Sequence, residues 1–369
     1  MRFPLPVLYV VFCATSYSAV PSTCAAPDPR LLTRLARTIV PAELRGDLSF
    51  LASDELKGRF TPSPGLNVAA EFIASRFRGA GLQPGGEHDS FFQEAAIEDR
   101  RAKLPDSTTP ASVIARNVIA ILPGSDPKLR DTYVLLTAHY DHIGTTATAG
   151  KEAGDHPSPD NSDLIYNGAN DDGSGTVSVI AIARALAARR VRPKRSIVFV
   201  LFFGEELGLR GSEFYAEHSL IPLSKMVAEL NLEQVGRTDS SEGPEIARVS
   251  LTGTGYSSLP SYVQCAASTT GVATYVDPGN DDYFVRSDNA VFARHGIPAH
   301  TLCVSFDYPD YHRVGDEWQK IDYDNMAKVD RTVAIAVLNV ANSVNAPHWN
   351  AANPKAAPFM HPPLQTTSR

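Results

Sequence analysis

One stretch of the chain, residues 196–212 (SIVFVLFFGEELGLRGS), limits what the fold can be. It begins with a continuous apolar run, Ser196–Phe203, which lacks the alternation of polar and apolar residues seen in half-exposed strands. Such a run is typical of a strand that is buried on both faces of an α/β sheet. Gly204 ends the run, and two adjacent carboxylates, Glu205 and Glu206, follow at once.

The two glutamates have two interpretations. An acidic pair can begin a helix, because carboxylates are stabilised at the positive end of the helix dipole. It can also belong to a ligand site, because ligands of open α/β sheets bind at the carboxyl ends of the strands. Two carboxylates this close shift each other's pKa unless a cation stabilises them. The other strand ends decide between these interpretations.

Predicted strands and helices alternate along the chain. Further apolar runs predict strands at Val113–Leu122, Thr132–Ala138, Met226–Leu232, Val249–Thr252, Ala273–Val276 and Ala299–Val304. Helical spacing predicts helices at Leu66–Ala80, Gly173–Arg189, Leu259–Thr269 and Asp322–Val344. We therefore expect one three-layer α/β domain, residues 27–344, with a central mixed, largely parallel sheet flanked by helices. Residues 345–369 contain prolines and lack periodicity, so we expect a disordered tail.

The first 26 residues resemble a secretory signal peptide. Arg2 supplies a positive region, Val7–Ala14 an apolar region, and small residues follow. The apolar run is too short for a membrane-spanning helix, so we expect an exported, periplasmic or extracellular protein without a stable membrane span. Cys24 follows Pro-Ser-Thr, a poor lipidation sequence, and we expect no lipid anchor there. The net charge of −7, without a basic block, argues against nucleic acid as a partner.

Two cysteines, Cys265 and Cys303, lie beyond this leader. They can form a disulfide in an oxidising compartment or remain buried free thiols, and the sequence leaves both possibilities open. Two cysteines do not make a disulfide scaffold, so the fold must depend on an apolar core. With 43% hydrophobic residues the chain has ample material for one.

Potential metal ligands follow the predicted strands where these end. His139 comes directly after Thr132–Ala138, and Asp141 lies two residues further on. At this spacing the carboxylate can accept the second ring N–H of a histidine that binds a metal. Other candidates occupy comparable places, namely Asp171 and Asp172 in NGANDDGSG, Glu205 and Glu206, Glu233 after Met226–Leu232, and His312 in DYHRVGDEW.

Two histidines with several carboxylates and no thiolate suit zinc or a similar metal, and the set is large enough for two ions. A single histidine or a single NDDG sequence is more often structural, but five such units at successive strand ends favour a site. The other histidines lack this context, and we expect surface or structural roles for His88, His142, His156, His218, His295 and His300.

These segments resemble metallopeptidase family 28, the co-catalytic zinc peptidases. The family includes secreted bacterial aminopeptidases of the leucyl type, glutamate carboxypeptidases and glutaminyl cyclases. The resemblance extends from about Phe50 to Val344 and rests on AHYDHIG, IYNGANDDGSG, FFGEELGLRGS, LNLEQVGR, RSDNAVFARHGIP and DYHRVGDEW, which occur in the family's order.

The resemblance implies a role for each ligand candidate. By this resemblance His139 and Glu233 bind one zinc ion, Glu206 and His312 bind the other, and Asp171 bridges both. It also implies that Glu205 is the general base and that Asp141 supports His139.

Two positions depart from the family pattern. Glu233 stands where the aminopeptidases often have aspartate, and its longer side chain can hold the metal differently. Asn289 follows Ser287 and Asp288 where the family often has histidine, so Asp288 is a candidate for a supporting role only. Tyr283 is a further candidate, either as a donor to the oxyanion of the reaction or as a packing tyrosine.

The expected function is that of a metallo-aminopeptidase with two zinc ions, which hydrolyses N-terminal residues from peptide substrates. The segment Gln93–Val113 is too short for the protease-associated insert of some relatives. Acidic residues in the long loop Gly144–Tyr166 favour a cationic substrate amine. A single-zinc enzyme similar to glutaminyl cyclases remains open, as does a carboxypeptidase of the same family. A carboxypeptidase needs a basic pocket, for which Arg210, Arg237 and Arg286 are candidates.

Overall fold

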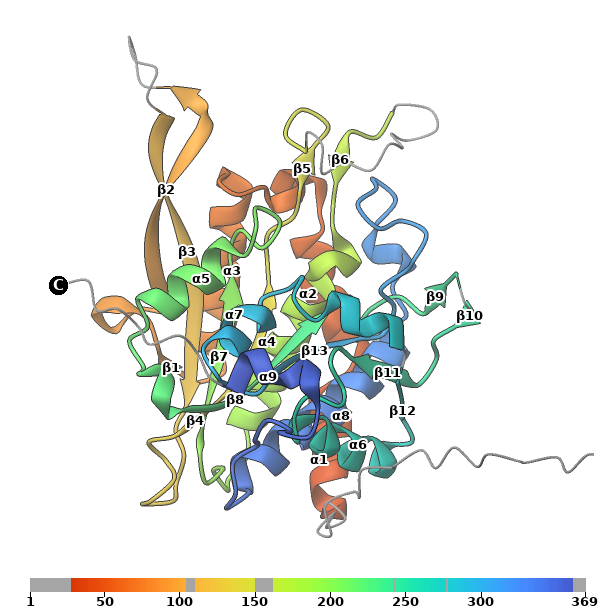
Figure 1. Cartoon of the computed structure of the whole chain (residues 1–369). Helices are drawn as coiled ribbons and strands as arrows, with labels where there is room; N and C mark the ends of the chain where they lie inside the picture. The colour runs from red at the N-terminus through yellow and green to blue at the C-terminus, as the bar shows by residue number, and fades with distance from the viewer. Residues whose placement is uncertain (1–27, 104–109, 150–161, 242, 277, 361–369) are drawn as a thin grey trace, which may run out of the picture.

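The computed structural model describes residues 28–103, 110–149, 162–241, 243–276 and 278–360 (Figure 1). In this part of the chain a mixed sheet lies between two layers of helices, which confirms the predicted α/β class. None of the described helices is both long and apolar enough to cross a membrane. The predicted signal peptide, with Cys24, lies outside the described residues, and so does most of the loop after Gly144.

The order of the strands places the parallel pairs at the centre of the sheet. The order is β1 (Gln83–Pro84), β3 (Pro110–Leu122), β7 (Ser196–Phe202), β4 (Tyr133–His139), β8 (Met226–Glu233), β13 (Ala299–Cys303), β11 (Arg248–Leu251) and β12 (Ala273–Tyr275). The four central strands β7, β4, β8 and β13 are parallel to one another, and β11 pairs parallel with β12. The pairs of β1, β7 and β2 (Phe92–Lys103) with β3, and of β11 with β13, are antiparallel.

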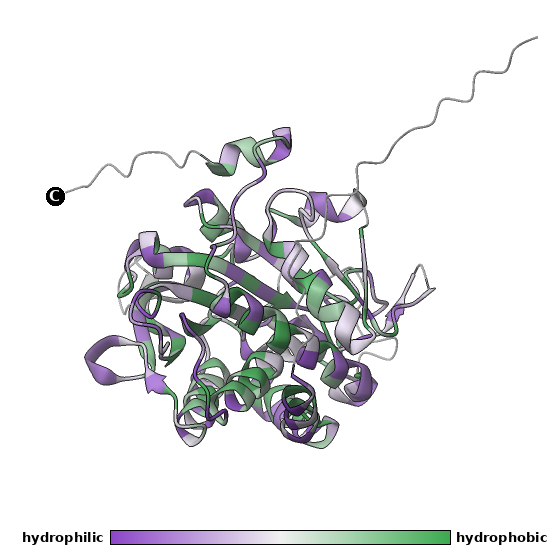
Figure 2. Ribbon diagram, turned by 90° about the horizontal axis from the view of Figure 1, so that it is seen from below, coloured by the Kyte–Doolittle hydropathy of each residue, from purple (hydrophilic) through white to green (hydrophobic). Residues whose placement is uncertain are grey.

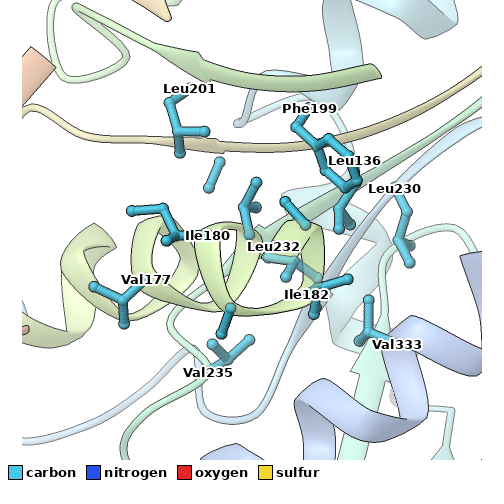
Figure 3. Close-up of a cluster of buried hydrophobic side chains, with 14 of the residues drawn as sticks. Leu136, Val177, Ile180, Ile182, Phe199, Leu201, Leu230, Leu232, Val235 and Val333 are labelled. Atoms are coloured by element: carbon cyan, nitrogen blue, oxygen red, sulfur yellow. The ribbon is translucent and has the colours of Figure 1, made fainter. Parts of the chain in front are cut away.

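Both faces of the sheet are buried, as the apolar run of β7 predicts. Phe199 and Leu201 point into the larger core cluster on one face, whereas Val198 and Val200 belong to the cluster on the other. Figure 3 shows the larger cluster between the sheet and α4 (Gly175–Ala187). Each side chain of this size contributes about 1.5–3 kcal/mol when it is fully buried. Apolar segments accordingly gather in the interior of the molecule (Figure 2).

The helices divide between the two faces of the sheet. The larger cluster contains residues of α1 (Pro29–Thr38), α2 (Pro41–Leu51), α3 (Pro64–Gly79), α4, α6 (Leu259–Thr270) and α8 (Tyr323–Asn342). The smaller cluster contains residues of α5 (Arg210–Glu217), α7 (Asn289–Arg294) and α9 (Ala357–Met360). Side chains set where the helices begin. Ser63 and Asp322 each accept a hydrogen bond from a backbone N–H in the first turn of α3 and α8, respectively.

Strand β3 begins three residues before the predicted strand Val113–Leu122 and forms a hairpin with β2, which the sequence analysis does not predict. Strands β2 and β3 pair from Phe92 opposite Val118 to Asp99 opposite Ala111, and the pairing continues to Lys103 after a shift in register. In Figure 1 the hairpin extends beyond the rest of the sheet. Polar residues and a proline conceal this hairpin in the sequence, because they break the apolar pattern that marks a strand.

The predicted disordered tail is wrong as far as Met360. Trp349 donates a hydrogen bond from Nε1 to the carbonyl of Gly296 at 2.9 Å and stacks on Phe359 with ring centroids 5.4 Å apart. Ala356 is buried and belongs to the smaller core cluster. These aromatic contacts and backbone hydrogen bonds, such as that from the N–H of Asn350 to the carbonyl of Tyr256 at 2.7 Å, hold a segment that has almost no periodicity. Residues 361–369 lie outside the described part of the chain.

The two cysteines beyond the leader are not bonded to each other. Cys303 ends β13 and carries a buried free thiol, whereas Cys265 on α6 is a disulfide cysteine. The possibility of a bond between Cys265 and Cys303 is therefore excluded.

Candidate metal centre and active site

The parallel strands bring the predicted ligands to one edge of the sheet. His139 is the last residue of β4 and lies opposite Phe202, the last residue of β7. The chain after β7 therefore carries Glu205 and Glu206 past the same edge, and Glu233 ends the next strand, β8. The register of the sheet explains why residues far apart in the sequence meet here.

Asp171 lies at the centre of the cluster. It comes from a short, irregular helical turn, Ala169–Ser174, directly before α4. Its Oδ1 lies 3.3 Å from Nε2 of His139, and its Oδ2 lies 3.1 Å from Nε2 of His312. Nε2 of His312 is also 3.2 Å from Oε2 of Glu206. One carboxylate thus faces two histidines, each with a different oxygen.

The turn that carries Asp171 is held by a second aspartate that the sequence analysis missed. Oδ2 of Asp316 accepts hydrogen bonds from the backbone N–H groups of Asn170 and Asp171, both at 3.0 Å, and from the hydroxyl of Tyr308 at 3.0 Å. Asp172 binds backbone N–H groups, including that of Gly175 at 3.0 Å. The backbone of the turn is therefore fixed from both sides. The signal for Asp316 was present, since it belongs to the quoted segment DYHRVGDEW.

Asp141 lies where it can support His139. Its Oδ1 is 3.4 Å from Nδ1 of His139 and accepts a hydrogen bond from the backbone N–H of Glu205 at 3.2 Å. Its Oδ2 accepts a hydrogen bond from the hydroxyl of Thr61 at 3.1 Å. Asp141 is fully buried, so its carboxylate meets protein groups such as these and not solvent. The supporting role remains a prediction that this geometry allows.

The remaining carboxylate candidates differ in where they lie. Glu205 lines a cavity of about 170 Å³, and its Oε2 is 3.9 Å from Nε2 of His139. Glu233 lines the same cavity, and the hydroxyl of Ser287 donates a hydrogen bond to its Oε1. Asp288 is not among the lining residues. It is buried behind the cavity, where Ser212 donates a hydrogen bond to its Oδ1 at 2.5 Å. The structure thus indicates Ser287, rather than Asp288, as the neighbour that holds a ligand candidate.

Tyr283 and Arg286 form part of the wall of this cavity. The ring of Tyr283 stacks on Phe306 with centroids 4.9 Å apart, and the guanidinium of Arg286 lies 4.9 Å from the centroid of Tyr283. The other arginines considered for a carboxylate pocket are engaged elsewhere. Arg237 pairs with Asp239 and Asp310, and Arg210 does not line the cavity.

The electrostatics of the cavity favour a bound cation. Its described lining holds five carboxylates and one guanidinium. Burial raises the pKa of Glu205 well above its usual range, and the charges of Glu233 and Glu206 raise it further against the effect of His139. Burial also raises the pKa of Glu233 to about 7. Carboxylates that are this reluctant to ionise next to one another are stabilised when a metal ion supplies positive charge.

Glu206 has the opposite character. Burial and the charge of Asp171 oppose its ionisation, but the contacts with His142 and His312 outweigh them and lower the pKa of Glu206 to about 2. Nδ1 of His142 lies 2.7 Å from Oε1 of Glu206. Of the expected surface or structural role for His142, a surface position is wrong, because the side chain is fully buried beside a ligand candidate. The signal was its place in AHYDHIG, three residues after His139.

The donor set fits a borderline metal such as zinc. Ligand atoms of His142, Asp171 and Glu206 all lie within 4.8 Å of one another. Imidazole nitrogens and carboxylate oxygens converge, and no cysteine lines the cavity among the described residues. These features are expected of a metal site.

An α/β sheet with such a cluster at the carboxyl ends of its parallel strands defines a metal-dependent hydrolase. The sequence model of Peptidase family M28 matches residues 117–337, which is more than half of the chain. The protein therefore belongs to Peptidase family M28, a family of enzymes that hydrolyse peptide bonds.

Two proteins of similar sequence align with this chain over different shares of their own length. A probable zinc metalloprotease of Pyrenophora teres f. teres is 25% identical over 389 residues, which are 91% of this chain and 75% of that protein. A probable zinc metalloprotease of Pyricularia oryzae is 30% identical over 235 residues, 60% of this chain and 41% of that protein. The alignment with the second relative thus spans less than half of its length.

Solved structures share the fold. The LapA aminopeptidase of Legionella pneumophila superposes with a TM-score of 0.61 at 20% identity, over 86% of this chain and 75% of that chain. The glutaminyl cyclase of Porphyromonas gingivalis superposes with a TM-score of 0.57 at 18% identity, over 80% of this chain and 96% of that chain. Because both activities occur on this fold, the fold alone does not choose between them.

Proposed function

We propose that this protein is a zinc-dependent aminopeptidase, which holds two zinc ions and removes single residues from the free N-terminus of a peptide. The observation that carries the proposal is the carboxylate of Asp171, whose two oxygens lie 3.3 Å and 3.1 Å from Nε2 of His139 and of His312. A carboxylate that faces two different histidines is the arrangement needed to share one ligand between two ions. The names of the relatives support zinc as the metal.

The remaining proposed ligands belong to one or the other of the two zinc positions. His139 and Glu233 would hold one zinc ion, and Glu206 and His312 the other, with Asp171 shared. When bound, two zinc ions can polarise the scissile carbonyl and lower the pKa of a water molecule toward neutrality. Asp141 orients His139 through the contact with its Nδ1, and Ser287 fixes the carboxylate of Glu233.

Glu205 serves as the general base. It lies beside the cluster with its Oε2 3.9 Å from His139 Nε2, and its backbone is fixed by the hydrogen bond to Asp141. Glu205 takes the proton of the attacking water and delivers it to the leaving amine of the cleaved peptide bond. Tyr283 lines the cavity and is our candidate for a hydrogen bond to the oxyanion.

The charge of the cavity supports recognition of the N-terminus. Three of the five carboxylates in the described lining would be zinc ligands, which leaves Glu205 and Asp307 to attract the ammonium group of a free peptide N-terminus, whereas Arg286 is the one arginine in that lining that a C-terminal carboxylate would meet. This balance favours an aminopeptidase over a carboxypeptidase. The shared Asp171 favours two ions over the single ion of a cyclase-like enzyme.

A panel of matched peptides tests the proposal. We expect the purified, zinc-loaded protein to release the first residue of a free peptide and to leave the N-acetylated peptide of the same sequence intact. Metal analysis should give close to two zinc ions per chain. Equal cleavage of both peptides, release of the last residue, or cyclisation of an N-terminal glutamine without hydrolysis would each overturn the assignment.

A further inference from the structure

We propose that His142 is a positioning residue of the metal centre, which holds the Glu206 carboxylate in the orientation needed to bind an ion beside His312. The proposal rests on the two-zinc site described above and assigns a role to a histidine outside the expected ligand set. His142 acts through Glu206 and is not itself required to touch the substrate.

The two oxygens of Glu206 have different partners. Oε1 lies 2.7 Å from Nδ1 of His142, and Oε2 lies 3.2 Å from Nε2 of His312. A glutamate side chain has several rotatable bonds, and without the contact to Oε1 the carboxylate can turn away from the cluster. The contact with His142 therefore selects the rotamer in which Oε2 faces the ligand position that Asp171 and His312 also face.

His142 is itself held on several sides, which makes it a rigid support. Its side chain is fully buried, and its backbone N–H donates a hydrogen bond to the carbonyl of Arg59 at 3.3 Å. The ring packs against the backbone of Gly168, where a Cβ atom would lie 2.4 Å from Cγ of His142. The ring also meets that of His312 edge to face, with centroids 5.6 Å apart.

Gly168 shows that the chain makes room for this ring. Its φ of +55° lies in the left-handed region that glycine adopts without strain, and a side chain there would displace the imidazole. The glycine belongs to the same loop that carries Asp171. The backbone of the metal loop and the ring of His142 are therefore packed as one unit.

The proposal requires that residue 142 donate a hydrogen bond to Oε1 of Glu206. A histidine next to a carboxylate donates from Nδ1, and an asparagine places its amide nitrogen close to the same point. His142→Asn should therefore keep the contact with Glu206, whereas His142→Ala removes it. His218→Ala serves as a control, because the ring of His218 is exposed on the surface and stacks on Phe214 instead.

Zinc affinity of the metal-depleted protein is the readout, measured by competition with a chromophoric chelator. We expect His142→Ala to weaken one of two zinc sites by about 10–100-fold, and His142→Asn to stay within a few-fold of the wild type. His218→Ala should match the wild type. Wild-type affinities at both sites of His142→Ala would overturn the proposal. So would an asparagine variant as weak as the alanine variant, because that result indicates a direct ligand.

A double-mutant cycle with Glu206→Ala tests whether His142 acts through Glu206. If it does, the double variant should bind zinc no more weakly than Glu206→Ala alone. A further loss in the double variant would contradict the proposal. The outcome is separable from that of the proposed function, since a wild type that binds two zinc ions without cleaving peptides refutes the aminopeptidase and leaves the positioning role intact.

Discussion

The carboxylate of Asp141 connects the ends of two neighbouring strands, because its Oδ1 accepts a hydrogen bond from the backbone N–H of Glu205 at 3.2 Å. The same oxygen lies 3.4 Å from Nδ1 of His139, at the end of β4. The side chain of Asp141 thus contacts both a proposed ligand, His139, and the proposed base, Glu205. The Oδ2 oxygen is held separately by Thr61, which fixes the plane of the carboxylate.

Asp141→Asn is expected to lower kcat/KM for a free peptide by about 10–100-fold, because the amide no longer supplies the negative charge that orients His139. Zinc affinity should fall with it. Thr61→Val is the matched control, since it removes only the hydrogen bond to Oδ2 and should cost less on both measures. An asparagine variant with unchanged zinc affinity and activity would show that Asp141 does not support the site.

Glu205→Gln is expected to retain its zinc and to lose activity by about 10²–10⁴-fold, because glutamine cannot accept the proton of the attacking water. Steady-state kinetics and metal analysis of the same sample check both halves of this expectation. Glu206→Gln, one residue further on, should instead reduce zinc content. Turnover close to the wild-type value in Glu205→Gln would remove this residue from the mechanism.

Asp171→Ala should change the metal content itself. Its carboxylate faces both His139 and His312, so its loss weakens both ion positions at once. We expect fewer than two zinc ions per chain after dialysis, and a smaller rise in Tm on adding zinc than the wild type shows. Two tightly bound zinc ions in this variant would mean that another residue bridges the positions.

The sequence predicts which ligand candidates lie close together where these candidates follow buried strands. The apolar run before Glu205 and the His-x-Asp spacing of His139 and Asp141 depend on strand ends, and parallel strands place these ends together. Residues that fix the ligand candidates through hydrogen bonds are harder to predict from the sequence. Ser287 and Asp316 act through hydrogen bonds between loops, and loop conformation has no periodic signal in the sequence.

Arg59 illustrates the same difficulty most clearly. An arginine at the end of a short helical segment, Asp54–Arg59, is expected at the surface, yet Arg59 is 1% exposed. Its guanidinium donates to the carbonyls of Leu51, Tyr140, Asn167 and Gly168 at 2.6 to 2.9 Å. It thereby connects the segment after β4 to the loop that carries Asp171. No local sequence pattern predicts that four carbonyl groups from different segments accept hydrogen bonds from one side chain.

Arg59→Met should destabilise the protein by at least about 3 kcal/mol, because it leaves four buried carbonyls without their donor. Chemical denaturation of the metal-depleted protein measures this loss without a contribution from zinc binding. Arg59→Lys keeps the charge but lacks the planar arrangement of donors, so its stability should fall between those of Arg59→Met and the wild type. Unchanged stability in Arg59→Met would show that water replaces the guanidinium at little cost.

Asp330 is a buried acid of α8 that is not among the described residues lining the cavity. Asp330 lies on α8, fully buried, and neither carboxyl oxygen has a hydrogen-bond partner among the described residues. Burial raises the pKa of Asp330 to about 7, and the smaller opposing effects of Ser178 and Arg331 do not offset it. The folded state therefore keeps a proton that the unfolded chain releases near pH 4, where an unperturbed aspartate ionises.

The sign of the pH dependence follows from this difference. Between about pH 4 and pH 7 the folded state binds more protons than the unfolded state, so the contribution of Asp330 to stability is present at low pH and is lost as the pH rises. Asp330→Asn removes the titration, and its Tm relative to the wild type should be higher at pH 8 than at pH 4. Asp324→Asn, an exposed substitution of the same kind on the same helix, is the matched control. A Tm difference for Asp330→Asn that is equal at both pH values would mean that Asp330 ionises in the folded protein as easily as in the unfolded chain.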